Sequence, residues 1–93
     1  MYVGIVRIEL HLPGSQSLKD KRSIVRGLKD RIRSRVSAAV AEVDHQDLWQ
    51  RAALGVAVVS GDAHHLHELL DSVRRLVEAT HGAELIEWQE QEA

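Results

Sequence analysis

Cysteine is absent from the 93 residues of this chain, proline occurs once and phenylalanine not at all. The lack of cysteine excludes disulfides, thiolate metal sites, iron–sulfur clusters and thiol catalysis, and it suits a reducing compartment. No apolar run approaches the roughly 18 residues that a membrane span needs. The start MYVGIVRIELHL also lacks the charged first region and the small-residue cleavage site of a signal peptide. We therefore expect a cytoplasmic protein with no membrane partner.

The motifs of common catalytic sites are absent as well. The chain contains no H-E-x-x-H, P-loop, G-x-G-x-x-G or nucleophile elbow, which are signatures of metalloproteases, nucleotide-binding proteins and hydrolases. An RNA-recognition motif places stacking aromatic residues on its central strands, whereas the polar face of the first expected strand carries Arg7, Glu9 and His11. We expect no enzymatic activity, no catalytic residue, no cofactor, no metal, and no stacking of bases on the sheet.

Hydrophobic periodicity predicts a strand followed by a helix in the first third of the chain. Apolar and polar residues alternate over residues 3–12, which is the period-2 pattern of a half-buried strand. The segment SLKD at residues 17–20 matches a capping box, so the first helix is expected to begin at about Leu18. Apolar residues at helical spacing up to Ile32 form its buried stripe, and cations at 33–35 suit its carboxyl-terminal end.

The remaining segments complete the order β-α-β-β-α-β. Two short β-branched runs separated by a polar stretch predict a hairpin with a long loop, the three segments being 36–43, 44–51 and 54–60. Asp62 is the expected N-cap of the second helix, Gly82 its C′ glycine, and a last strand over 83–88 precedes the acidic tail at 90–93. This order predicts a single domain over residues 1–93. Its class is α+β, a ferredoxin-like α/β sandwich with a four-stranded antiparallel sheet and two helices on one face.

Charge is distributed unevenly along the chain. Residues 19–35 carry eight basic groups against Asp20 and Asp30, a net charge of +6. Residues 36–93 carry three basic and eleven acidic groups, a net charge of −8, and the whole chain has a net charge of −2. A basic segment of this density can attract a polyanion even though the whole molecule is slightly acidic.

A row of cations follows one exposed line of the first helix, about 120° around the helix axis from the buried stripe. Spacings of three and four residues place its five members side by side: Lys19, Arg22, Arg26, Lys29 and Arg33. Cations about 5–6 Å apart can meet successive phosphates, which supply most of the sequence-independent affinity for nucleic acid. A solvated helix face is an equally simple interpretation, but only Asp30 lies beside the row to neutralise it.

Two further groups of residues are candidate sites. Lys21 points into the apolar arc of the first helix, where it either snorkels past the sheet edge or forms, with Ser17, an anion-binding site at the helix N-terminus. The loop before the third strand is dense in polar and aromatic groups that suit contact with a partner: Asp44, His45, Asp47, Trp49 and Arg51. In the alternative interpretation its aspartates only shape the turn and its tryptophan packs onto the sheet. We predict that Trp49 is at least partly exposed.

Similarity to a known family is carried by two segments, VGIVRIELHLPGSQSLKDKRSIVRGLKDRIRSR and VAEVDHQDLWQRAALGVAVVS, and extends over essentially the whole chain. They resemble the YlxP-like family of small bacterial proteins, a domain of unknown function. The resemblance implies a ferredoxin-like α/β sandwich and a cytoplasmic protein whose gene, in many bacteria, lies near that of ribosome-binding factor A. It implies no established activity and no catalytic or binding residue.

These observations favour one functional hypothesis and leave others open. The leading hypothesis is a non-enzymatic module that binds RNA or a ribosomal subunit through the cations of the first helix. The alternative is a small-ligand or anion-binding regulatory domain that uses the turn between the first strand and the first helix. An acylphosphatase-like hydrolase shares the fold and size, but its glycine-rich arginine loop is replaced here by LPGSQSLKDKR. An exposed sheet edge would also allow a homodimer.

Overall fold

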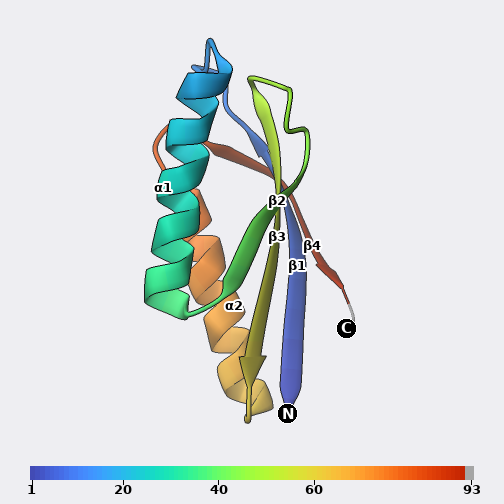
Figure 1. Ribbon diagram of the computed structural model, residues 1–93. Coiled ribbons are helices and arrows are strands. Elements are labelled where there is room, and N and C mark those ends of the chain that lie inside the picture. Colours follow the sequence, from blue (N-terminus) through green and yellow to red (C-terminus); the bar gives the residue numbers. More distant parts are fainter. Residues whose placement is uncertain (92–93) are drawn as a thin grey trace.

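Four strands and two helices form the structure, a computed structural model that describes residues 1–91. The elements are β1 (Tyr2–His11), α1 (Leu18–Val36), β2 (Ala39–Asp44), β3 (Arg51–Ser60), α2 (Ala63–Glu78) and β4 (Glu84–Gln91). The strands pair in the order β2-β3-β1-β4, each neighbouring pair is antiparallel, and both helices cover the same face of the sheet (Figure 1). The predicted ferredoxin-like α/β sandwich is confirmed.

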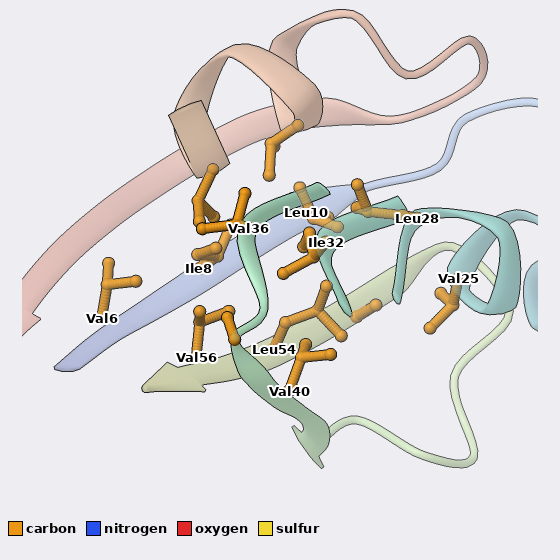
Figure 2. Close-up of a cluster of buried hydrophobic side chains, with 14 of the residues drawn as sticks. Val6, Ile8, Leu10, Val25, Leu28, Ile32, Val36, Val40, Leu54 and Val56 are labelled. Carbon is orange, nitrogen blue, oxygen red and sulfur yellow. The ribbon is translucent and has the colours of Figure 1, made fainter. Parts of the chain in front are cut away.

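The hydrophobic core lies between the sheet and the helices (Figure 2). Alternate residues of the central strand β1 point into this layer, and Val6, Ile8 and Leu10 are 0% exposed. They share one buried cluster with apolar residues of both helices, including Leu28 and Ile32 of α1. Because the chain has no cysteine, this burial, at roughly 25 cal/mol per Å² of apolar surface, is the main source of stability.

The first helix begins where predicted and ends later. Ser17 is its N-cap, and the Ser17 Oγ accepts a hydrogen bond of 3.0 Å from the Asp20 amide. Val36 remains helical because it occupies the core position one turn after Ile32. Ser37 then adopts the left-handed conformation, with φ of 57°, and ends the helix. The expectation of a strand from residue 36 onward is therefore wrong, and β2 begins later.

The loop between β2 and β3 is shorter than predicted. Asp44 and Arg51, which were expected in the loop, end β2 and begin β3 respectively. Arg51 pairs with His11, so the antiparallel ladder continues to the end of β1. The sequence did not reveal the early start of β3, because Ala52 and Ala53 follow Arg51 and two small apolar residues in a row show no alternation of polar and apolar positions. The connection that remains comprises residues 45–50 and is called the 45–50 loop below.

The last strand is longer than predicted. β4 reaches Gln91 and so takes up part of the expected acidic tail, while residues 92–93 lie outside the described residues. Gly82 is not the C′ residue of α2, because the helix ends at its C-cap Ala79. It lies instead in the turn before β4 with φ of 86°, a left-handed conformation that favours glycine.

Candidate nucleic-acid interface

The five cations predicted to form a row do lie along one side of α1. Two contacts fix the orientation of the helix. Arg33 Nη2 donates a hydrogen bond of 2.9 Å to the carbonyl oxygen of Val40 in the edge strand β2. On the opposite flank, Arg31 Nη2 donates one of 3.1 Å to Thr80 Oγ1, just after α2. The row therefore borders β2 and points away from α2. We call Lys19, Arg22, Arg26, Lys29 and Arg33 the basic row.

The cations in the amino-terminal part of the basic row are exposed and have no carboxylate partner among the described residues. Lys19, Arg22 and Arg26 are exposed, and together with Ser23 they line a hollow of about 540 Å³. Among the residues that the structure describes, no carboxylate oxygen lies within 4.0 Å of these three cations. Like charges three or four residues apart destabilise a helix by roughly 0.2–0.5 kcal/mol per pair. This trio therefore carries an uncompensated charge that a bound anion would relieve.

The cations in the carboxyl-terminal part of the basic row are less available, because they are partly buried or already bonded within the chain. Lys29 is half-buried, and the Arg33 guanidinium is bonded to β2. Arg33 Nη1 also lies 3.6 Å from Asp30 Oδ1, at an exposed site where such a pair contributes little. Fewer than five cations of the basic row are therefore fully available to a ligand.

Lys21 is buried instead of reaching solvent. Its side chain is 1% exposed, and its Nζ lies 2.8 Å from Glu42 Oε2 on β2. The same ammonium donates a hydrogen bond to the carbonyl oxygen of His45. Ser17, the other predicted anion contact, already uses its Oγ to cap α1. Both groups of the predicted anion site at Ser17 and Lys21 thus have partners within the chain, and a carboxylate matches the ammonium charge internally.

Three of the five predicted loop contacts belong to a charge cluster on the open face of the sheet, which the helices leave uncovered. Its centre is Glu9, whose side chain is 12% exposed and whose carboxylate lies 2.7 Å from Arg7 Nη2. Arg51 Nη2 lies 3.0 Å and His45 Nε2 3.2 Å from the same carboxylate. Arg7 Nη2 is also 3.3 Å from Asp44 Oδ2. We call these five residues the Glu9 cluster.

The basic groups of the Glu9 cluster keep its carboxylates ionised. Burial on its own raises the pKa of Glu9, but hydrogen bonds from Arg51, Arg7 and His45 outweigh burial and lower it overall. The His45 amide and then Arg7 lower the pKa of Asp44. The hydrogen bond to Glu9 in turn raises the pKa of Arg7. Two carboxylates and two guanidiniums thus neutralise one another, so the cluster offers little free charge to a partner.

The sequence predicted that Glu9 and Arg7 lie on the polar face of the first strand, but it did not predict their contact with the loop residues. Only the strand register does so: Glu9 stands opposite Ala53 on β3, which places it beside Arg51. The alternation of polar residues along the first strand showed that Arg7 and Glu9 share one face of the sheet. It could not show which residues of other strands lie next to them on that face.

The other two predicted loop contacts, Asp47 and Trp49, lie exposed on the 45–50 loop. Trp49 is 53% exposed, which confirms the predicted exposure, and its neighbour Leu48 is 48% exposed. Contact of these residues with a partner remains a prediction.

Metal sites and membrane-spanning helices are both absent from the described part of the chain. Within it, no group of three or more His, Cys, Asp or Glu side chains is arranged to hold a metal ion. None of its helices combines the length and apolarity that crossing a membrane requires.

The structure thus defines an α+β sandwich with an unpaired basic helix flank, and comparison with known proteins assigns it to a family. The family model described as "Protein of unknown function (DUF503)" matches residues 3–90, and the chain belongs to this family. The uncharacterized protein YlxP of Bacillus subtilis (strain 168) is 26% identical over 77 residues, which are 83% of this chain and 84% of that protein. The predicted resemblance to the YlxP-like family is confirmed.

The fold also has a counterpart among solved structures. A de novo designed protein with a ferredoxin fold, solved by solution NMR, aligns with a TM-score of 0.64 at 13% sequence identity. The alignment covers 100% of this chain and 88% of the designed one. At this identity the likeness concerns the fold alone, because one fold hosts many unrelated functions.

Proposed function

We propose that this protein is a non-enzymatic RNA-binding module that docks on RNA, free or within a ribosomal subunit, through the basic row. The observation that carries the proposal is the unpaired trio Lys19, Arg22 and Arg26. These side chains point away from the core, so they do not serve packing. They also lack carboxylate partners among the described residues, whereas other cations have one, such as Lys21 beside Glu42, Arg51 beside Glu9 and Arg74 beside Glu78.

The shape of this surface suits a polyanion better than a small anion. Three cations at spacings of three and four residues extend along more than one turn of α1, which matches successive phosphates along a chain. Two of them are arginines, whose guanidinium groups bind phosphate through paired hydrogen bonds. The hollow that they line with Ser23 is formed by exposed residues of α1.

Charge reversal on the row tests the proposal. We expect the variant Arg22→Glu/Arg26→Glu to lose affinity for a labelled RNA by roughly tenfold or more at low salt, because it removes two phosphate contacts. The matched control is Arg35→Glu/Arg75→Glu, which changes the net charge equally at two exposed arginines lining a different hollow. The control should bind nearly as tightly as the wild type, because Arg35 lies nine residues beyond Arg26, about 13 Å along α1, and Arg75 lies on α2, away from the row. Exposed charges at such a distance are largely screened.

Salt dependence gives an independent measurement. For three phosphate contacts we expect log K to fall with log salt at a slope of about −2, since each neutralised phosphate of a single strand contributes roughly −0.7. Fluorescence anisotropy measures this slope, and co-sedimentation with ribosomal subunits at two salt concentrations shows whether subunits bind in the same way. Equal binding of the row variant and the wild type would refute the proposal.

A further inference from the structure

The 45–50 loop presents two large apolar side chains to solvent. Trp49 is 53% exposed and Leu48 is 48% exposed, and the two are neighbours at the tip of the loop. An indole usually gains stability by burying its ring while its N–H finds a polar partner. Packing within this chain leaves both side chains half free, so core formation does not account for them.

This exposed tip is held by several hydrogen bonds. The Leu48 amide donates one of 3.0 Å to the His45 carbonyl, which also accepts a hydrogen bond from the buried Lys21. Gln50 accepts one of 2.9 Å from the Leu12 amide, and its side chain donates one of 3.1 Å to the Ser15 carbonyl. A loop fixed in this way presents its side chains at little entropic cost on binding.

The chemistry of the tip suits a nucleobase. A hollow of about 420 Å³ is lined by Asp47, Leu48, Trp49, Gln50 and Arg51. The indole and the leucine offer an apolar surface on which a planar ring can stack. The Asp47 carboxylate can pair with the edge of a base, since carboxylates accept hydrogen bonds from exocyclic amino groups. The Gln50 Nε2 donates to Pro13 and Ser15, so only the Gln50 Oε1 can join it, as an acceptor. A carboxylate here would repel a phosphate, so the hollow favours a base over the backbone.

The position of the hollow relates it to the basic row. The Gln50 side chain bonds to Pro13 and Ser15 in the turn that leads into α1. The 45–50 loop therefore lies at the end of the molecule where α1 begins (Figure 1), and Lys19 and Arg22 stand on the first turns of that helix. A nucleic acid strand that runs along the row reaches this end within a few nucleotides.

We infer that the hollow beside Trp49 binds an unpaired nucleobase, so that the RNA recognised by this protein is single-stranded where it passes the 45–50 loop. This inference rests on the proposed function and names its ligand more closely. In a duplex the bases are stacked on one another and paired, so none is available to the indole. Phosphates on the basic row supply affinity, and the base on Trp49 supplies the preference for a single strand.

The experiment uses the full chain with Trp88→Phe as background, so that Trp49 is the only tryptophan. The probes are a ten-nucleotide RNA and the same sequence annealed to its complement, both at low salt. We expect the single strand to quench Trp49 fluorescence and the duplex to quench it much less. Replacing Trp49 by Ala should weaken binding of the single strand by roughly 5- to 150-fold, the range measured for one stacked base, whereas Trp49→Phe should retain most of the affinity.

The outcomes separate this inference from the proposed function. If Arg22→Glu/Arg26→Glu abolishes binding while Trp49→Ala leaves it unchanged, the base site is refuted and the basic row stands. Equal affinity for single strand and duplex also overturns the inference. If neither RNA binds the wild type, the proposed function fails as well, and the exposed tip would then serve a protein partner. A thermal melt checks folding, which the exposed position of Trp49 should leave nearly unchanged.

Discussion

Replacing Lys21 by methionine removes a positive charge that is buried between α1 and β2. The Lys21 side chain is 1% exposed, and its Nζ lies 2.8 Å from Glu42 Oε2 and donates to the His45 carbonyl. Methionine has nearly the same length and fills the same apolar passage, so the variant loses charge and hydrogen bonds but little volume. Any change in the free energy of unfolding then reports on the polar contacts.

The expected size follows from the surroundings of the partner. Removing one member of a buried ion pair costs about 3–5 kcal/mol, because the other charge remains buried and unpaired. Here the Glu42 side chain is 18% exposed, so water can hydrate its carboxylate in part and reduce the cost. We expect Lys21→Met to lower the free energy of unfolding by about 2–4 kcal/mol. In a chain of this size that corresponds to a fall in Tm of roughly 8–30 °C.

Urea denaturation followed by circular dichroism measures the effect, with Lys19→Met as the matched control. Lys19 is exposed on the same turn of α1, so its substitution should change the free energy of unfolding by no more than about 0.5 kcal/mol. The double variant Lys21→Met/Glu42→Leu should recover part of the loss, because two apolar groups replace a broken pair. If Lys21→Met is as stable as the Lys19→Met control, the burial of the ammonium and the reasoning built on it are wrong.

Two further predictions concern the core and the Glu9 cluster. Leu28 is 1% exposed in the core, so Leu28→Ala should cost about 2–5 kcal/mol by chemical denaturation, and a melt like that of the wild type would contradict the packing. The pKa of Glu9 lies below its ordinary value of 4.5, so the unfolded chain binds more protons in acid. The stabilisation is therefore present above about pH 4.5 and is lost as pH falls through the lowered pKa. Glu9→Gln should flatten the dependence of the unfolding free energy on pH in this acid range, and an unchanged acid limb would show that the cluster does not hold Glu9 ionised.

The order of elements was predictable because each of the two helices and the first strand has a clear period. Strand one alternates up to Leu12, and Ser17 and Asp62 are N-caps as their residue types indicated. The ends of the hairpin were less predictable, because small apolar residues occupy both faces around Ala39 and Ala52. Where both faces are alike, periodicity cannot mark a boundary, and the pairing with neighbouring strands decides it.

The part of the candidate site that lies on α1 was predictable from the sequence, whereas the contacts around the hairpin were not. The basic row depends only on the phase of one helix, which the apolar stripe fixes. Lys21 was recognisable as an oddity because it falls within that stripe, but its partner Glu42 depends on the register of β2, which the sequence left open. The Glu9 cluster likewise joins residues of three strands, and such long-range partners follow from sheet pairing rather than from spacing along the chain.

α1 carries a buried cation that contacts the 45–50 loop and exposed cations that belong to the basic row. Lys21 faces inward and fixes the His45 carbonyl at the start of the loop, while Lys19 and Arg22 face outward from the same turns. In the proposed RNA-binding mode Lys21 is a positioning residue: it would touch no RNA, but it bonds to the segment that presents Trp49. Under conditions where Lys21→Met remains folded, the salt dependence of RNA binding should be unchanged, because the phosphate contacts of the row persist. The preference for single strand over duplex should decrease, because the loop loses the hydrogen bond from Lys21 and is held less firmly. A merely structural role for Lys21 would instead lower binding of both RNAs in equal proportion to the unfolded fraction.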